Sequence, residues 1–547
     1  MTELSKSEKE IYDLRREKVE KLKRTESFPT YYKNTSFISD IHANHQSLDN
    51  GEQTDISVAV RGRVLSIRSF GKLTFIDVKD STGKIQLLAS KDDLDEKLEE
   101  HIELMDVGDI VGTSGSIMKT KKGELSLKIS NLIVLSKSLR TLPEKWHGLK
   151  DKETRFRQRY LDLIVNDDAK KTIDTRFKVL KLIREFMVSD GFIEVETPTL
   201  QPKAGGAIAK PFVTHHNAMS IDMFLRIAPE LYLKRLVVGG FEKVFEIARV
   251  FRNEGLSTRH NPEFTMLELY EAYADWDDIM ELAENLIEFL AVELTGSSTV
   301  SYDGKEIDLS TPWRRASMID LIREQTGNEV SLETPINELR QLCSQHDIEI
   351  HSAYGPGKLI LELYEKTVEP NIWNPCFVTE YPKEVSPLSR DHRSKPGFTE
   401  RFEGIVAGRE ILNGFSELVD SEEQMERFED QVEKSKSGDE EAMGIDIDYV
   451  RALEFGLPPT GGIGIGIDRL VMMLADVQTI RSVFEDRCLP LHSSASSDIS
   501  IILSWGAAKT TTSTLSPNAV KGFLKLCVAS LVTFFIPSPR PSTSPIL

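Results

Sequence analysis

The sequence predicts an α+β protein in which a small N-terminal β-barrel precedes a larger domain of mixed helices and strands. Between residues 55 and 140, short alternating apolar stretches follow one another between turn signals. Between residues 161 and 483, longer helical patterns and strand patterns are mixed. The sequence contains neither GxxxxGK followed by Ser or Thr nor GxGxxG at a strand-to-helix turn, so a bound nucleotide would not be held by a P-loop.

The N-terminal barrel is predicted from patterns with a period of two residues. Val58, Val60 and Val64 alternate with Ala59 and Arg61, as expected for a half-buried strand. Further short strands fit Leu73–Val78, Ile85–Ala89, Ile110–Ile117, Leu125–Ile129 and Leu132–Leu135. Short strands at this spacing over about eighty residues favour a small five-stranded barrel such as an OB-fold, which often binds single-stranded nucleic acid.

Residues 1–54 are predicted to form a helical extension that ends in a loop over residues 46–54. Ile11, Leu14, Val19 and Leu22 form one apolar stripe on a helix otherwise rich in Lys, Arg and Glu. We interpret it as a solvated docking helix, and a basic arm on RNA is the alternative. The segment has no apolar core of the kind found in secretory signals, and its acidic residues argue against a transit peptide.

The composition is that of an ordinary soluble enzyme. The 547 residues are enough for two or three domains, with 40% hydrophobic and 28% charged residues. Because the net charge is −19, nucleic-acid binding must rest on local basic patches. The four cysteines form no CxxC pair, which argues against a zinc ribbon or disulfide framework and suits a reducing cytoplasm.

The larger domain is predicted to follow a polar linker at residues 141–160 and to extend over residues 161–483. A helical face from Phe177 to Met187 stops at Asp190-Gly191, and Pro229–Val238 reads as a second helix that Gly239 closes. Residues 244–251 are predicted to form a buried strand, and Asp275–Leu294 a long amphipathic helix.

The chemistry is expected around a polar loop between two strands. Arg252 and Glu254 end the first strand, and Arg259 and His260 precede the second. Guanidinium and imidazole groups on such a loop are suited to gripping a polyphosphate. On the second strand, Glu268 and Tyr270 are two residues apart, so both side chains face the same side of the strand. The alternative to a binding site is that these charged residues form a satisfied salt-bridge network.

Two further motifs carry carboxylates and glycines. Glu403 and Glu410 are seven residues apart with a hinge at Gly408, and such a pair suits Mg²⁺, which takes one or two carboxylates plus phosphate oxygens. Alternate glycines at residues 461–466 indicate that something flat approaches the backbone of a strand. Arg469 follows at the start of a helix, where it can stack on a ring or pair with a phosphate.

The order of these motifs resembles that of the class II aminoacyl-tRNA synthetases, and longer strings resemble the bacterial-type, lysine-specific subgroup, the lysyl-tRNA synthetases. The likeness covers about residues 55–483. The strings that carry it are Ala204–Phe212 with Thr214-His215, Leu225–Leu236, Phe251–Gly255, His260–Thr265 and Asn413–Leu418.

The resemblance implies an N-terminal OB-fold that binds the anticodon, a six-stranded antiparallel catalytic sheet flanked by helices, and a cytoplasmic homodimer. It implies a ligase that joins L-lysine to tRNA(Lys) with ATP and Mg²⁺, with no membrane partner. The residues it assigns to catalysis are Arg252, Glu254, His260 and Arg469. The residues it assigns to ATP binding are Arg252, Glu254, His260, Asn261, Phe264, Glu403 and Arg469.

The resemblance also assigns the amino acid, metal and tRNA. Glu403 and Glu410 would hold Mg²⁺. The residues expected around lysine are Gly206, Glu230, Arg252, Glu268, Tyr270, Asn413, Phe415 and Glu417. The residues expected at the anticodon are Arg68, Phe75, Gln86 and Glu124. From its place in an alternating strand, Phe75 has the alternative of being a barrel core residue.

The chain departs from the family near its end. Residues 484–547 are rich in Ser, Thr and Pro, and an apolar run at Val520–Ile536 is interrupted by Lys521 and Lys525. We interpret this tail as non-native sequence from a frameshift or a fused reading frame. The alternative is a genuine appended tail, such as a membrane contact.

Other functions remain open to the sequence. A catalytically inactive RNA-binding relative is disfavoured because the assigned residues are all present. A sister enzyme that lysylates a protein is disfavoured because such relatives lack the anticodon barrel. Aspartyl specificity is disfavoured because Glu230 and Glu417 would repel an acidic side chain.

Overall fold

The computed structural model describes residues 5–25, 27–33, 35–143, 149–352, 354–436 and 444–484. The atypical tail from residue 485 onward, including Cys488 and Cys527, lies outside these described residues. Cys343 and Cys376 are buried free thiols, as the absence of a cysteine framework predicts. No helix in the described ranges is long and apolar enough to cross a membrane.

The N-terminal strands close into a barrel with the order β1-β2-β3-β5-β4, which confirms the predicted five-stranded barrel. Its strands are β1 Gln53–Phe70, β2 Leu73–Lys79, β3 Lys84–Ser90, β4 Ile110–Lys119 and β5 Leu125–Ser136. The prediction of two separate strands at 125–129 and 132–135 was wrong. β5 is continuous because it pairs with β4 along its whole length, and an irregularity between Ser114 and Gly115 of β4 absorbs the change of register.

Three helices accompany the barrel: α1 Lys6–Leu22, α2 Ile38–His45 and α3 Glu96–Leu104. The sequence did not reveal α3, which Asp95 caps by accepting the backbone N–H of Leu98. The predicted α1 docks through its basic residues as much as through its apolar ones. Arg15 donates to the carbonyl oxygens of Ser138 and Arg140 at 2.7 and 3.0 Å.

The predicted apolar stripe of α1 is only partly used. Leu22 is fully buried, whereas Ile11 and Leu14 are 38% and 56% exposed. Lys18 forms an ion pair with Asp106 at 2.8 Å. The docking-helix interpretation therefore fits the structure. Arg15 and Lys18, two cations that the alternative basic arm would use on RNA, contact the barrel domain instead.

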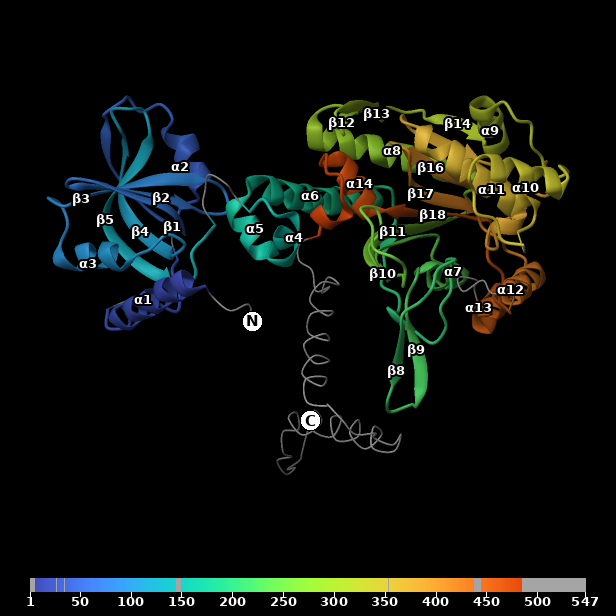
Figure 1. Ribbon diagram of the computed structural model, residues 1–547, viewed down its shortest axis with the longest axis horizontal. Coiled ribbons are helices and arrows are strands. Elements are labelled where there is room, and N and C mark those ends of the chain that lie inside the picture. The colour runs from blue at the N-terminus through green and yellow to red at the C-terminus, as the bar shows by residue number, and fades with distance from the viewer. Residues whose placement is uncertain are drawn as a thin grey trace, which may run out of the picture. The chain divides into compact units, whose positions relative to one another are not determined.

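An eight-stranded sheet forms the centre of the larger domain, in the order β14-β15-β16-β17-β18-β11-β10-β6 (Figure 1). Its strands are β6 Ile193–Glu194, β10 Lys243–Phe251, β11 Glu263–Ala272, β14 Arg314–Ser317, β15 Cys376–Thr379, β16 Arg401–Val406, β17 Arg409–Ser416 and β18 Thr460–Gly466. The six strands from β15 to β10 are antiparallel, as expected, and β14 and β6 add a parallel strand at each edge.

Helices cover one face of this sheet and form the main hydrophobic core. They are α6 Asp167–Ser189, α8 Trp276–Thr295 and α14 Ile467–Leu474. The predicted stop of α6 is confirmed, since Asp190 caps it and Gly191 follows with a φ of +86°. Leu267, Leu269 and Ile463 point into this core, so the residues between them on the same strands face the other side.

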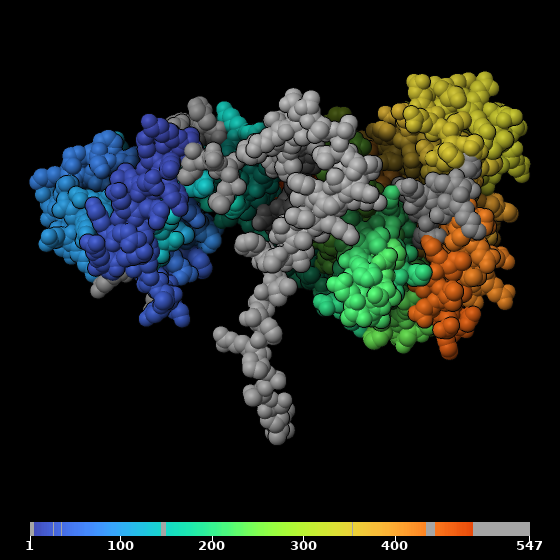
Figure 2. Space-filling model, turned by 60° about the horizontal axis from the view of Figure 1, so that its bottom comes forward, coloured from blue at the N-terminus to red at the C-terminus, as the bar shows by residue number. Residues whose placement is uncertain are grey.

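The remaining elements surround the sheet. They are α4 Lys152–Arg157 and α5 Arg159–Val165 at the predicted linker, α7 Glu230–Val238, the sheet of β7 Leu200–Gln201, β8 Val213–His216 and β9 Ile221–Leu225, the hairpin of β12 Thr299–Tyr302 and β13 Lys305–Asp308, α9 Met318–Thr326, α10 Ile336–Gln345, α11 Pro356–Thr367, α12 Ser421–Lys436 and α13 Ile447–Leu453. Short 3₁₀ turns occur at Glu369–Asn371, Lys383–Val385 and Ile480–Ser482. Helices α9 to α11 share a second core with β15 and form the yellow surface of Figure 2.

Candidate active site

The uncovered face of the central sheet carries polar residues at matching positions on four strands. Glu403 of β16 pairs with Asn413 of β17, Asn413 pairs with Gly464 of β18, and Gly464 pairs with Glu268 of β11. Side chains of paired residues project from the same face of a sheet. The sheet therefore gathers these residues from three distant parts of the sequence.

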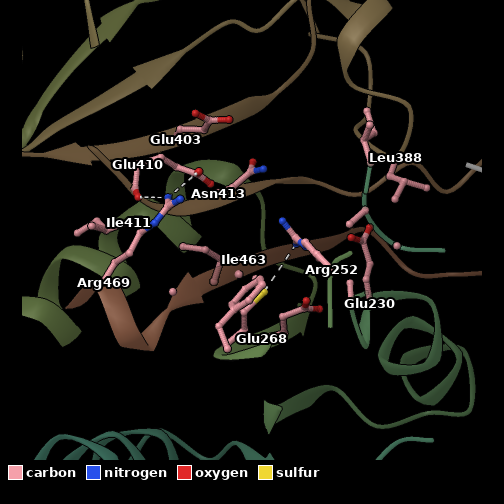
Figure 3. Close-up of a pocket in the computed structure, with 18 of the residues that line it drawn as sticks. Glu230, Arg252, Glu268, Leu388, Glu403, Glu410, Ile411, Asn413, Ile463 and Arg469 are labelled. Atoms are coloured by element: carbon pink, nitrogen blue, oxygen red, sulfur yellow. Dashed lines mark hydrogen bonds and ion pairs between the residues drawn. The ribbon is translucent and has the colours of Figure 1, made fainter. Parts of the chain in front are cut away.

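A cavity of about 400 Å³ lies against this face. The predicted residues that line it are Gly206, Glu230, Arg252, Glu254, His260, Asn261, Phe264, Glu268, Tyr270, Glu403, Glu410, Asn413, Phe415 and Arg469. Figure 3 shows that Glu230 and Glu268 flank Arg252, while Glu410 and Arg469 lie on the other side of the pocket. Glu417 lies behind the wall of the cavity and is almost completely buried.

One end of the cavity is cationic. Arg469 donates to the carbonyl oxygen of Glu410 at 2.6 Å and to its carboxylate at 3.1 Å. It also lies 3.2 Å from Nε2 of His260, which must then be an acceptor, so the imidazole is neutral and its Nδ1 carries the proton toward Ser257. Burial, and then the charge of Arg469, lower the pKa of His260 in agreement with this neutral state.

Arg252 is one of the cations without an ion pair that line the pocket in the part of the chain that the structure describes. It forms no ion pair there; its Nε donates weakly to the carbonyl oxygen of Ile227 at 3.4 Å. Its guanidinium lies over the ring of Phe264 at 5.2 Å. Burial lowers the pKa of Arg252, but a guanidinium remains charged at neutral pH. Arg252 is therefore available to a carboxylate or a phosphate.

The other end of the cavity is acidic. Burial, and then the charge of Glu230, raise the pKa of Glu268 to about 8. Tyr270 donates to Glu268 at 3.2 Å, which confirms that the two side chains share one face of β11. Behind them, the carboxylate of Glu417 contacts the ammonium of Lys234.

The glycines of β18 have two separate functions. A Cβ on Gly462 would lie 2.5 Å from Cε1 of Tyr270, and on Gly464 it would lie 2.9 Å from Cε of Met266. These two glycines keep the cavity open. Gly461 faces the opposite side, where a Cβ would lie 2.5 Å from Cγ1 of Ile279 in α8. The sequence predicted that something approaches the backbone of this strand closely. On one face it is helix α8, and on the other face the glycines line the cavity.

Family comparisons agree with this geometry. The description "tRNA synthetases class II (D, K and N)" matches residues 151–485, and "OB-fold nucleic acid binding domain" matches residues 58–135.

The chain belongs to the class II tRNA synthetases.

Curated relatives of this class II synthetase share about half of its residues. A lysine–tRNA ligase of Thioalkalivibrio sulfidiphilus is 48% identical, covering 88% of this chain and 97% of the relative. A lysine–tRNA ligase of Pectobacterium carotovorum is 50% identical, covering 86% and 94%. A lysine–tRNA ligase of Nostoc punctiforme is 47% identical, covering 87% of each chain.

The two carboxylates predicted to hold metal lie on neighbouring strands of this synthetase. Burial, and then the charge of Glu410, raise the pKa of Glu403 to about 8. Arg401 binds Glu403 at 2.8 Å, and Arg469 binds Glu410 at 3.1 Å. A divalent cation would relieve the repulsion between the two carboxylates. Within the described ranges no third acidic or histidine ligand completes such a site, which fits an ion that takes its other ligands from phosphates and water.

Sequence reasoning missed two cations of the site. Arg401 bridges Glu403 and Asn413, the latter at 3.2 Å, and stacks on Tyr381. The sequence could have indicated Arg401, because it lies two residues before Glu403 on the same strand and so faces the same side. Lys234 was missed although it lies one helical turn after Glu230 on the same helix.

On the barrel, three of the four predicted anticodon residues lie on one outer face. Arg68 is opposite Phe75, and Arg68 binds Asp77 at 3.2 Å. Gln86 is opposite Asp77 and accepts from Ser126 at 3.2 Å. Glu124 is exposed beside the β4–β5 turn.

Phe75 is only partly buried and does not belong to the barrel core, which includes its neighbours Ile76 and Val78. Its ring instead meets that of Phe70 edge-on at 6.2 Å. Phe70 is 67% exposed and was missed by the sequence reasoning. The core interpretation of Phe75 is therefore wrong, and two aromatic rings are available on this face.

Proposed function

We propose that the chain is a lysine–tRNA ligase, which activates L-lysine with ATP and transfers the lysyl group to tRNA(Lys). The observation that carries this proposal is the polarity of one cavity. Its cationic end suits the phosphates of ATP, and its acidic end suits a substrate with two ammonium groups. The names of the relatives point to the same substrate.

The cationic end is assigned to ATP. Arg252 binds the α-phosphate and the lysine carboxylate, since it is free and lies between the two ends. His260 and Arg469 meet the outer phosphates. Phe264 stacks on one face of adenine, Arg469 covers the other face, and Glu254 receives the adenine amino group. Asn261 shapes the loop, because its amide donates to the carbonyl oxygen of Glu263 at 2.5 Å.

The acidic end is assigned to lysine. Glu230 and Gly206 receive the α-amino group, with Glu268 beside them. Tyr270 and Glu417 receive the ε-ammonium. Asn413 and Phe415 form the side wall of the pocket. An uncharged analogue would leave the acidic end with more carboxyl groups than cations, and sites built to satisfy a polar substrate group discriminate by roughly 10⁴-fold without editing.

The first reaction is an in-line displacement. A carboxylate oxygen of lysine bonds to the α-phosphorus of ATP as the bond to the pyrophosphate oxygen breaks. No protein nucleophile is required, because alignment and charge neutralisation lower the barrier. Glu403 and Glu410 would hold Mg²⁺, which neutralises phosphate charge when it is bound.

The barrel face with Arg68, Phe75, Gln86 and Glu124 is assigned to the anticodon. Ring stacking there would contribute about 1–3 kcal/mol per base. A homodimer through residues 191–198, the segment that resembles the first class II motif, is also part of the proposal. Its support is the exposure of Phe177, Val188 and Ile193, which are 52%, 60% and 50% exposed on α6 and the adjoining β6. We place the enzyme in the cytoplasm.

The test is lysine-dependent ATP–pyrophosphate exchange by the purified full-length chain, with aspartate and asparagine as controls. Exchange with lysine alone supports the proposal. A folded protein that exchanges with none of the three amino acids, or with aspartate, would contradict it. Charging of tRNA(Lys) in the same preparation tests the transfer step.

A further inference from the structure

Lys234 is a buried cation inside the acidic end of the pocket. It lies on α7 one helical turn after Glu230, and its side chain has no exposed surface. Its Nζ donates to Glu230 at 2.5 Å and contacts the carboxylate of Glu417. The ring centroids of Phe415, Tyr270 and Tyr449 lie 5.3, 5.9 and 5.9 Å from the same nitrogen. The ammonium is therefore enclosed by two carboxylates and three aromatic rings.

This ammonium keeps its charge. Burial alone lowers the pKa of Lys234, but the charges of Glu230 and Glu417 raise it further, and the net pKa lies above its ordinary value. Burial raises the pKa values of Glu230 and Glu417, and Lys234 opposes that rise without cancelling it. Removing the ammonium would therefore drive the carboxylates toward their protonated forms.

Glu417 has unused capacity to accept hydrogen bonds. Both of its oxygens are buried, and neither has a donor in hydrogen-bond geometry among the described residues, although one forms the ion pair with Lys234. A Cβ added to Gly462 would collide with its Oε1, so that oxygen lies against the backbone of the glycine that lines the cavity. Glu417 thus contacts one ammonium behind the wall and can still accept hydrogen bonds from a second.

The balance of charges in the pocket indicates that the second ammonium comes from the substrate. Glu230, Glu268 and Glu417 carry three negative charges when ionised, and Lys234 supplies one positive charge. Of the nearby guanidiniums, Arg401 is paired with Glu403, and Arg252 is assigned to the substrate carboxylate. Because the pKa of Glu268 is about 8, this carboxyl is mostly protonated at neutral pH in the substrate-free protein, and one negative charge remains for a second ammonium.

We propose that Lys234 is a positioning residue for lysine recognition, a permanent counter-ion that favours the ionised forms of Glu230 and Glu417 and holds both in place for the ammonium groups of the substrate. The inference rests on the proposed function. Lys234 does not touch the reacting atoms. It acts through the two carboxylates, so its removal should affect lysine and leave ATP binding unchanged.

The test compares Lys234→Met with Arg235→Met in the full-length chain by ATP–pyrophosphate exchange. Met matches the length of Lys without its charge. Arg235, on the same helix, pairs with Asp446 at 2.7 Å outside the pocket, so its replacement controls for loss of a helix cation. We expect Lys234→Met to raise the KM for lysine by ~10- to 100-fold, with the KM for ATP unchanged. Arg235→Met should leave both KM values unchanged.

The pH profile separates positioning from a merely structural role. Because the carboxylates lose a cation in Lys234→Met, their pKa values rise, and the acid limb of kcat/KM for lysine moves to higher pH. If Lys234→Met does not fold, Lys234→Gln, which keeps a hydrogen-bond donor without charge, takes its place with the same expectation.

The outcomes are distinct. A folded neutral variant with the wild-type lysine KM and acid limb overturns the role of Lys234 while the proposed function stands. An equal rise in the KM values for lysine and ATP also overturns it, because a general distortion would produce that result. Wild-type protein without lysine-dependent exchange overturns the proposed function and this inference with it.

Discussion

Replacing Gly462 by alanine is the most direct test of the lysine pocket. The backbone of β18 at Gly462 has no positive φ, so alanine meets no conformational penalty there. Its Cβ, however, would lie 2.5 Å from Cε1 of Tyr270 and in contact with Oε1 of Glu417. Both neighbours are fully packed, and neither can move away without disturbing the other. The perturbation therefore falls on the two residues assigned to the ε-ammonium.

The expected magnitude follows from the cost of overpacking. An extra carbon in a well-packed site costs about 1–3 kcal/mol. At 25 °C this corresponds to a loss of about 5- to 150-fold in kcat/KM for lysine. We expect the loss to appear mainly in the KM for lysine, measured by ATP–pyrophosphate exchange at saturating ATP, and the KM for ATP to stay near its wild-type value.

Two other glycines of β18 provide matched controls. At Gly466, a Cβ would have only ordinary contacts, the nearest at 3.7 Å from the carbonyl oxygen of Ile411, so Gly466→Ala should change the lysine KM far less. At Gly461, a Cβ would strike Ile279 of the core, so Gly461→Ala should lower the melting temperature. Equal effects of the Gly462 and Gly466 substitutions on the lysine KM would refute the assignment of the pocket floor.

Three further outcomes are expected. The pKa of Glu268 is raised from 4.5 in the unfolded chain to about 8 in the folded protein. Its contribution to the free energy of folding is therefore fully present below pH 4.5 and is lost as the pH rises through 8. Glu268→Gln should therefore raise the melting temperature of the substrate-free protein more at pH 8 than at pH 5, and equal changes would count against the shift. Glu403→Gln and Glu410→Gln should each raise the Mg²⁺ concentration required for exchange by ~10-fold or more, as a Mg²⁺ titration would show. An unchanged requirement in both would remove the proposed metal site. Phe75→Ala should raise the KM for tRNA(Lys) in the charging assay by about 5- to 150-fold, corresponding to 1–3 kcal/mol of lost stacking, and an unchanged KM would show that this ring does not contact the tRNA.

Local patterns in the sequence determined most of the elements. The apolar run of β10, the alternate polar residues of β11, the stop of α6 at Asp190 and Gly191, and the amphipathic pattern of α8 depend on residues a few positions apart. Their physics is local, since pleat, capping and left-handed glycine turns involve only neighbours. The strings around Arg252 and Asn413 pointed to the synthetase family in the same way.

Local patterns failed where distant contacts decide the outcome. The two short strands predicted at the end of the barrel are one strand because β4 pairs along its whole length. The adjacent glycines Gly461 and Gly462 look alike in sequence. Only the packing of α8 on one face and of Tyr270 on the other shows that the first serves the core and the second the cavity.

The sequence alone determined which residue types the site contains, and the tertiary structure decided how their charges are shared. Glu230 and Glu417 were predictable as carboxylates for an ammonium substrate. That Lys234 already lies between them was not, because the pairing joins a helix to a strand end far along the chain. A buried charge takes its partner from whatever the fold encloses with it, so the number of charges available to the substrate is set only when the chain has folded.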